Sequence, residues 1–301
     1  MDLRSKIFLI YGPTASGKSN FAIKLAKKIN GEIINADSMQ IYKELKILSA
    51  RPYKKDYQNI KHHLYGFLSV KKNFSTGDWL KLVDKKIIHL RKKKKIPILV
   101  GGTGLYFKSL TEGLVRIPNI PIQFREKIRS LHLKLGQKKF FTKLVNLDPQ
   151  KKKKINSSDT QRSIRAYEVK LFTKKSMYEW FKNTKSNYEK ADFYKIYIDF
   201  PRKDLVKKIE TRANEMLKSG AIQEVKRFLK SGVSKNKSAS KAIGINEVRE
   251  YLAKKIKKEE VIEKISIKTR QYAKRQNTLK RGHMQEWNKM NPKSLDKFLK
   301  K

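Results

Sequence analysis

The sequence predicts an α/β fold, in which a parallel β-sheet is flanked by helices and interrupted by an all-helical insertion. Short apolar runs such as IFLIY (7–11) and PILVGG (97–102) have the composition of strands buried on both faces. Segments with apolar residues at helical spacing alternate with these runs, as they do in parallel α/β sheets. Between the third and the last expected strand, the chain has a long stretch of helices and basic loops.

The elements follow in order along the chain. We expect strands at 7–11, 32–37, 97–102 and 195–200, and helices at 19–29, 78–91 and from about residue 105. Two prolines in RIPNIPI (116–122) mark a boundary, and no strand is expected between 123 and 190. The predicted organisation is a core in two parts, 1–117 and 194–301, around a helical insertion at 118–193.

The composition is extremely basic. The 301 residues include 73 Lys and Arg against 27 Asp and Glu, a formal net charge of +46. Such a charge favours a polyanionic partner such as nucleic acid, although a lysine-rich genome also produces basic chains. There is no cysteine, which excludes disulfides and thiolate metal sites. With no signal peptide and no apolar run of membrane-spanning length, we expect a cytoplasmic protein without membrane contact.

A phosphate-binding loop follows the first expected strand. The segment GPTASGKS fits G-x-x-x-x-G-K-[ST], and it lies between a strand and a helix, which is the context that this motif needs. Its glycines let backbone amides face an anion, Lys18 reaches a terminal phosphate, and the Ser19 hydroxyl can bind Mg²⁺. The motif makes the predicted sheet P-loop NTPase-like. The loop residues are Gly12, Pro13, Thr14, Ala15, Ser16, Gly17, Lys18 and Ser19.

Two further segments follow expected strands and therefore should lie near this loop. Asp37 opens the sequence DSMQ, and it could be a Mg²⁺ ligand, a general base or a helix N-cap. Thr103 lies in GGTG, where the glycines allow close backbone approach and the hydroxyl could meet a phosphate, although such glycines often serve only a tight turn.

Basic residues recur on two expected helices. Arg212 shares a face with apolar residues, so it needs a partner, which could be a diphosphate or a carboxylate of the core. In TRQYAKRQNTLKR (269–281), Arg270, Lys274, Asn277 and Arg281 line one face, which suits a nucleic-acid backbone or a solvated surface. The adjacent His62 and His63 have no neighbouring ligands in the sequence, so they indicate a metal site only weakly.

Taken together, these segments resemble the tRNA dimethylallyltransferase family, also called tRNA isopentenyltransferases. The resemblance covers nearly the whole chain in the expected order. Its segments are GPTASGKS (12–19), ADSMQIYK (36–43), ARP (50–52), HHL (62–64), LVGGTGLYFKSLTEGL (99–114), DTQRSIRAYEV (159–169), IETRANEML (209–217), KAIG (241–244) and TRQYAKRQ (269–276).

The resemblance implies a reaction and its site. Dimethylallyl diphosphate would be the prenyl donor, the acceptor would be N6 of the adenosine 3′ to the anticodon of tRNA, and Mg²⁺ would be the cofactor. Asp37 aligns with the family's general base, and Thr103 and Arg212 align with catalytic residues that handle the diphosphate and the reacting centre. The helical insertion resembles the module that grips the anticodon stem-loop. The residues that would contact tRNA are Asp37, Ser38, Met39, Gln40, Asp159, Thr160, Gln161, Arg162, Ser163, Lys241, Gly244, Arg270, Lys274, Arg275, Gln276 and Arg281.

The chain departs from the family pattern at three positions. The family usually has an aromatic and often a basic residue where Ile245 and Asn246 stand, and a Trp where Leu279 stands. These departures concern RNA contacts or local packing. The chain has no cysteine for the zinc finger that eukaryotic members often carry, so it is similar to the bacterial form. The resemblance implies no protein partner, and we expect a monomer.

Three other classes share some of these features. A P-loop kinase of a small molecule or nucleotide would share the loop and Mg²⁺, but it would leave the DTQR segment and the basic helix without a role. An isopentenyltransferase of free adenine nucleotides is a closer alternative, against which the basic insertion argues. A non-catalytic RNA-binding protein would explain the charge but not the combination of Lys18, Ser19, Asp37 and Thr103.

Overall fold

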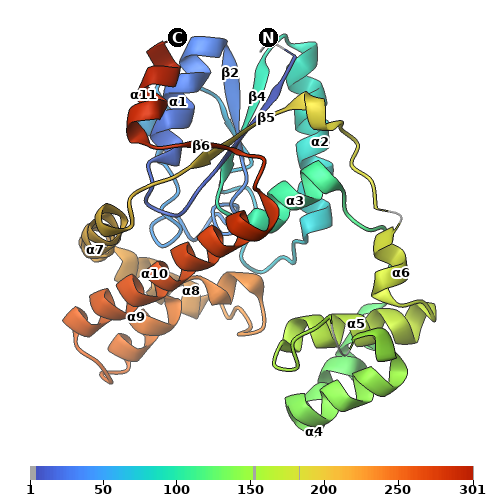
Figure 1. Ribbon diagram of the computed structural model, residues 1–301. Helices are drawn as coiled ribbons and strands as arrows, with labels where there is room; N and C mark the ends of the chain where they lie inside the picture. Colours follow the sequence, from blue (N-terminus) through green and yellow to red (C-terminus); the bar gives the residue numbers. More distant parts are fainter. Residues whose placement is uncertain (1–4, 152–153, 183, 301) are drawn as a thin grey trace. The chain divides into compact units, whose positions relative to one another are not determined.

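A single parallel sheet organises the larger part of the protein (Figure 1). The computed structural model describes residues 5–151, 154–182 and 184–300. Within them the sheet has six strands in the order β3-β2-β4-β1-β5-β6, and every neighbouring pair is parallel. The strands are β1 (Ile7–Tyr11), β2 (Gly31–Asn35), β3 (His62–His63), β4 (Ile96–Gly101), β5 (Phe193–Ile198) and β6 (Asn288–Met290). The predicted α/β fold, P-loop NTPase-like with a parallel sheet flanked by helices, is confirmed.

The strand ends differ from the prediction by a few residues. The strand expected at 195–200 is Phe193–Ile198, because Phe193 pairs with Ile7 at the start of β1. The short edge strands β3 and β6 were not predicted. They are two and three residues long and mostly polar, so neither carries the apolar run that marks a buried strand.

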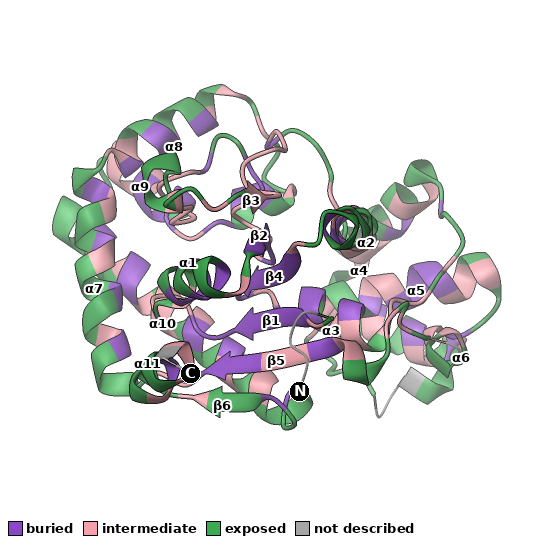
Figure 2. Ribbon diagram, turned by 90° about the horizontal axis from the view of Figure 1, so that it is seen from above, coloured by how far each residue is buried: buried purple, intermediate pink, exposed green. Residues whose placement is uncertain are grey.

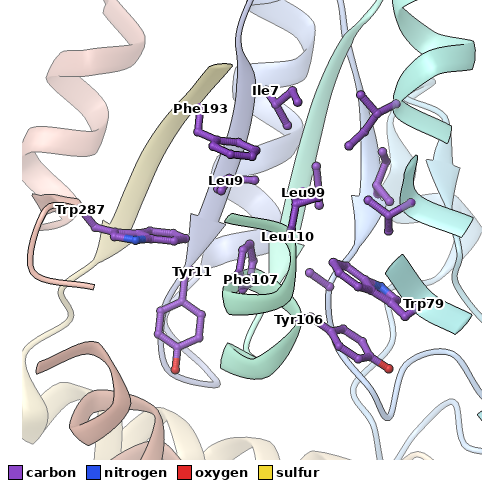
Figure 3. Close-up of a cluster of buried hydrophobic side chains, with 14 of the residues drawn as sticks. Ile7, Leu9, Tyr11, Trp79, Leu99, Tyr106, Phe107, Leu110, Phe193 and Trp287 are labelled. Carbon is purple, nitrogen blue, oxygen red and sulfur yellow. The ribbon is translucent and has the colours of Figure 1, made fainter. Parts of the chain in front are cut away.

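Helices cover both faces of the sheet, and the alternation of side chains along β1 decides which core each residue joins. Phe8 and Ile10 pack with helices α1 (Lys18–Ile29) and α11 (Pro292–Lys300). Ile7, Leu9 and Tyr11 face the other way and pack with α2 (Thr76–Lys92) and α3 (Gly104–Glu112), as Figure 3 shows. The strands β1, β2 and β4 are buried along their whole length (Figure 2).

A second helical layer lies at the carboxyl edge of the sheet (Figure 1). It comprises α7 (Arg202–Lys218), α8 (Ala221–Lys230), α9 (Ile245–Leu252) and α10 (Lys258–His283). These helices share an apolar core with the segment 41–48, which follows β2. Short 3₁₀ turns occur at Lys54–Tyr57, Pro149–Lys151, Lys190–Asp192 and Ser238–Lys241.

The chain divides into two compact units. One comprises 1–111 and 188–301, and the other comprises 112–187, against the expected insertion at 118–193. The smaller unit contains α4 (Ile122–Leu147), α5 (Thr160–Thr173) and α6 (Met177–Lys182). Gly136, at φ 70° and ψ 165°, breaks α4 into two helices, and this lets Ile128 and Phe140 enter one small core with α5.

No helix in the described ranges is both long enough and apolar enough to span a lipid bilayer.

Candidate active site

The phosphate loop has the conformation that an anion cradle requires. Gly17 at φ 83° and Ala15 at φ 64° turn the chain from β1 into the first turn of α1. The buried hydroxyl of Ser16 makes no hydrogen bond to any described residue. A buried polar group without a partner costs free energy, so it marks a place that a ligand atom can fill. Ser19 lies in the same turn of α1 with an exposed side chain.

Lys18 lies at this loop and, among the residues that the structure describes, forms no ion pair with a carboxylate. Its Nζ donates to the carbonyl of Pro13 at 2.6 Å. Burial lowers the pKa of Lys18 to about 7; Asp37 opposes this shift, and Arg212 adds to it. An arriving phosphate would supply the negative charge that this ammonium group lacks.

Asp37 faces the loop from the end of β2. Its Oδ1 accepts hydrogen bonds from the amides of Met39 at 2.8 Å and Gln40 at 3.4 Å, and its own amide donates to Asn35 Oδ1 at 2.9 Å. Burial raises the pKa of Asp37, and these amides, together with Lys18 and Arg212, oppose the rise. No helix begins after Asp37, so it is a turn residue rather than the helix N-cap considered from the sequence.

Thr103 positions the DSMQ segment. Its Oγ1 accepts a hydrogen bond from the amide of Ser38 at 2.9 Å and donates to Ser38 Oγ at 3.2 Å. The backbone segments that follow β2 and β4 come this close because Gly101 has no side chain. A Cβ on Gly101 would lie 2.0 Å from the carbonyl oxygen of Ala36. The turn is therefore tight for a packing reason, and Thr103 joins the ends of β4 and β2.

Arg212 reaches the loop from α7. Its Nη1 donates to Thr14 Oγ1 at 3.0 Å, and within the described residues it forms no ion pair with a carboxylate. Burial lowers the pKa of Arg212, and Glu215 and Asp37 oppose this. The core salt bridge considered from the sequence is thus absent there, and the guanidinium faces the phosphate loop.

Gln276 lies inside the protein, although the resemblance had placed it among the tRNA contacts. Its Oε1 accepts from the amide of Thr14 at 2.9 Å, and its Nε2 donates to the carbonyl of Gly102 at 2.9 Å. The side chain is 4% exposed. The hydroxyl of Tyr11 donates to the backbone carbonyl of Gln276 at 2.9 Å, so α10 is fastened to both loops of the site.

Two adjoining cavities open at this edge. Asp37, Arg212, Thr14, Ser49 and Ala50 line both. The first also has the loop residues 14–19, Gln40, Tyr65, Lys208 and Gln276 along its wall. The second has a largely apolar wall with a few polar groups, formed by Ser38, Met39, Leu48, Ile209, Ala213, Met216, Lys241, Ala242, Ile243, Ile265, Thr269, Tyr272 and Arg275. One compartment is therefore suited to phosphates and the other to an apolar group or a flat ring.

Ser49, Ala50, Tyr65 and Lys208 are among the lining residues that were not predicted as site residues. Lys208 lies one helical turn before Arg212, so the helical spacing could have found it. Ala50 opens the ARP segment of the resemblance. Nothing in the sequence around Ser49 or Tyr65 distinguishes them.

The predicted basic stripe of α10, formed by Arg270, Lys274, Asn277 and Arg281, lies along one groove, and Arg275 lies elsewhere. Arg275 lines the second cavity of the site. Arg270, Lys274 and Arg281 instead line a separate groove between α7 and α10, where Arg270 also pairs with Glu210 at 3.2 Å. One helix therefore contributes to the site through one face and to a basic groove through another.

The KAIG segment has mixed roles. Lys241 is exposed at the second cavity, whereas Gly244 is buried and begins α9 with φ 105°. A Cβ on Gly244 would lie 2.4 Å from Leu48 Cδ2, so packing and conformation explain this glycine. Among the departures from the family pattern, Ile245 is fully buried and Leu279 packs against Gly104, so both serve the interior.

The DTQRS segment begins α5 in the smaller unit. Asp159 caps the helix by accepting from the amide of Arg162 at 3.0 Å, and the two side chains form an ion pair at 3.1 Å. Thr160 is half-buried, whereas Gln161 is exposed. Ser163 is buried and donates to the carbonyl of Asp159, so it supports the helix from inside.

The neighbouring histidines lie away from these loops, on the edge strand β3. His63 Nε2 contacts Glu32 Oε2 at 2.6 Å, and His62 stacks on Tyr57. In the described ranges no three His, Cys, Asp or Glu side chains form a group that could hold a metal ion.

A phosphate loop at the carboxyl edge of a parallel sheet defines an α/β protein of P-loop NTPase-like fold. The model of the family "IPP transferase" matches residues 40–283, and the chain belongs to this family. A protein of Pelagibacter ubique named tRNA dimethylallyltransferase is 60% identical to this chain. The match covers all of this chain and 96% of that relative. A tRNA dimethylallyltransferase of Rickettsia massiliae is 43% identical over 94% of this chain and 78% of the relative. The chain is therefore an enzyme of the prenyl-transferring class.

Solved structures agree with this assignment. The tRNA delta(2)-isopentenylpyrophosphate transferase of Staphylococcus epidermidis is 33% identical, with a TM-score of 0.68 over 98% of this chain and 97% of that one. A eukaryotic dimethylallyltransferase acting on tRNA is 27% identical, with a TM-score of 0.81 over 95% of this chain and 73% of that one.

Proposed function

We propose that this chain transfers a dimethylallyl group from dimethylallyl diphosphate to N6 of the adenosine 3′ to the anticodon of tRNA, releasing diphosphate. The observation that carries the proposal is the convergence of Lys18, Arg212 and Asp37 on two adjoining cavities, one lined by the phosphate loop and one largely apolar. The names of the relatives support tRNA as the acceptor.

The donor fits the two cavities as one molecule. Its diphosphate would lie against the amides of the loop, with Lys18 and Arg212 as cations and the Ser16 hydroxyl as a further donor. Its prenyl chain would lie against the apolar wall that includes Ile209 and Met216. A nucleoside triphosphate would bring a polar ribose to that wall.

The transfer balances as a substitution at one carbon. The adenine N6 attacks C1 of the prenyl group, the bond between C1 and the diphosphate oxygen breaks, and its electron pair leaves with the diphosphate. Lys18, Arg212 and the loop amides stabilise the charge that develops on the leaving oxygen. The N6 proton passes to the carboxylate of Asp37, which the amides of Met39 and Gln40 hold in place.

The loop fits a magnesium ion that binds mainly through the substrate. Ser19 presents its exposed hydroxyl to the cavity, and Mg²⁺ commonly takes one or two protein oxygens together with substrate phosphates and waters. Ser19 would hold the ion, which when bound would neutralise charge on the diphosphate.

The acceptor adenine must leave its base stack before its N6 can reach Asp37 and the prenyl donor in the cavity. An unpaired loop nucleotide is less costly to extrude than a paired one, which favours an anticodon loop over a duplex. Lys241 and Arg275 at the second cavity, and the helical unit 112–187, would contact the RNA around that base.

The test is incorporation of labelled dimethylallyl diphosphate into bulk tRNA. We expect label in tRNA with the wild-type chain and almost none with Asp37→Ala. Unlabelled dimethylallyl diphosphate should compete with the label far better than ATP does, which separates a prenyltransferase from a kinase. The proposal fails if no label enters tRNA, or if Asp37→Ala transfers label as fast as wild type.

A further inference from the structure

A buried carboxylate gathers three arginines in the helical unit 112–187. Glu168 of α5 is 2% exposed. Its Oε2 lies 3.3 Å from Arg125 Nε and 3.2 Å from Arg165 Nη1, and its Oε1 lies 4.0 Å from Arg129 Nε. Arg125 and Arg129 come from α4 and Arg165 from α5, so the carboxylate joins the two helices.

The charges in this group do not balance. Three guanidinium groups surround one carboxylate, which leaves two positive charges. They carry about fifteen N–H donors, against about four acceptor sites on the carboxylate. The arginine side chains are 38% to 52% exposed, so their remaining donors reach solvent. A purely structural ion pair between α4 and α5 would need only one of them.

The fixed geometry suits one class of ligand. Most of the basic side chains of this chain are lysines, which are flexible point charges. Guanidinium groups gathered around a shared carboxylate instead present planar forks that match the oxygens of a phosphate. Because Glu168 already attracts the three side chains to one place, and accepts a hydrogen bond from Arg165 at 3.2 Å, less entropy is lost on binding than with unpaired side chains.

We propose that Arg125, Arg129 and Arg165, which we call the arginine cluster, bind a backbone phosphate of RNA, and that Glu168 is the residue that positions them. The proposal rests on the proposed tRNA-modifying function and assigns the helical unit a defined phosphate contact.

The first test compares two charge-removing variants of one helix. Arg129 belongs to the cluster, whereas Lys127 is exposed on α4 and belongs to no ion pair in the described part of the chain. With a synthetic anticodon stem-loop RNA, Arg129→Ala should bind about tenfold more weakly, and its log Kd against log salt should have a slope smaller by about one. Lys127→Ala should change affinity about twofold. Equal effects of the two variants would overturn the proposal.

The second test uses the sign of a charge effect. Glu168→Gln makes the protein more positive, so a diffuse basic surface would bind RNA as well or better. The arginine cluster predicts weaker binding, because an amide cannot hold three guanidinium groups together. Binding that is unchanged or tighter contradicts the proposal.

A milder variant covers the case in which Glu168→Gln unfolds α5, which circular dichroism detects. Arg129→Lys keeps the charge at the most exposed arginine of the three but loses the planar fork. It should weaken RNA binding, whereas Lys127→Arg, the reverse exchange, should not; equal binding by both overturns the proposal.

Transfer activity separates the two proposals. If wild type binds and modifies tRNA while Arg129→Ala matches Lys127→Ala, the arginine cluster alone is wrong. If wild type neither binds the stem-loop nor modifies tRNA, the proposed function and the arginine cluster both fail.

Discussion

Two half-buried groups at the site have their protonation shifted in opposite senses. Burial lowers the pKa of Lys18 to about 7 and raises the pKa of Asp37. The proposed chemistry needs Lys18 charged, to bind diphosphate, and Asp37 ionised, to accept the N6 proton. Each group is therefore less often in its working state in the empty site than in water.

This opposition predicts a bell-shaped pH dependence of kcat/KM for dimethylallyl diphosphate. On the acid side the rate rises with pH as Asp37 loses its proton, at a higher pH than an ordinary carboxyl group would require. On the alkaline side the rate falls as pH rises above about 7, because Lys18 of the free enzyme loses its charge. Initial rates across pH measure both limbs.

The control is Lys18→Arg, whose guanidinium stays charged throughout this range. Its alkaline limb should move to higher pH, whatever the loss in absolute rate. An alkaline limb at the same pH in both proteins would assign it to another group.

Gln276 gives a second prediction at this scale. Gln276→Met keeps the side-chain volume but removes the partner of the Thr14 amide and of the Gly102 carbonyl. We expect KM for dimethylallyl diphosphate to rise about tenfold, since a lost hydrogen bond of this kind costs about 1–3 kcal/mol, while affinity for tRNA stays near wild type.

The matched change on the same helix is Lys274→Met, at an exposed position of the basic groove. It should weaken tRNA binding and leave KM for the donor unchanged. If Gln276→Met behaved like Lys274→Met, Gln276 would be an RNA contact after all.

At the scale of elements, helices hold the short connections that form the site. Residues 48–50 line the site, and Glu224 of α8 holds the segment that leads to them by accepting hydrogen bonds from the amides of Lys46, Ile47 and Leu48. Leu48 in turn packs against Gly244 at the start of α9.

This contact predicts that Gly244→Ala destabilises the fold. The residue combines φ 105° with a neighbour at 2.4 Å, so we expect urea unfolding to show a loss of about 1–3 kcal/mol. Gly282→Ala, in the last turn of α10 with no atom near its Cβ position, should be neutral or slightly stabilising. A Gly244→Ala variant as stable as wild type would remove the packing explanation.

The elements also show what the sequence can predict. Apolar runs located the four long strands, and helical spacing located α1, α2 and the start of α3, because burial leaves a clear periodic pattern. The phosphate loop and Asp37 were predictable because they follow strands that end at one edge of the sheet. Gln276 was not, since a polar residue on a helix looks the same whether it faces RNA or two backbone loops.

At the scale of the whole molecule, the net charge of +46 should dominate encounter with tRNA. We expect the affinity for an anticodon stem-loop to fall steeply as salt rises, with a slope of about −0.7 to −0.9 per phosphate contact. Binding measured by fluorescence anisotropy across a salt series gives the slope. A flat response would remove phosphate contacts from the account.

The charge alone could not have identified the activity. A basic surface is common to many RNA-binding proteins, and in the proposed function the arrangement of Lys18, Asp37, Thr103 and Arg212 around the loop distinguishes a transferase from a binding module. That arrangement depends on parallel strands that are distant in sequence, which the sequence indicates only through the order of its motifs.

The most direct test of the central claim is the single-turnover rate of Asp37→Asn. The amide oxygen can still accept from the amides of Met39 and Gln40, so the turn and both cavities should persist, but the side chain can no longer take the N6 proton. We expect transfer to tRNA to slow by about 10²- to 10⁴-fold, with dimethylallyl diphosphate and tRNA bound as tightly as by wild type. Transfer at the wild-type rate would contradict the role of Asp37 as the base.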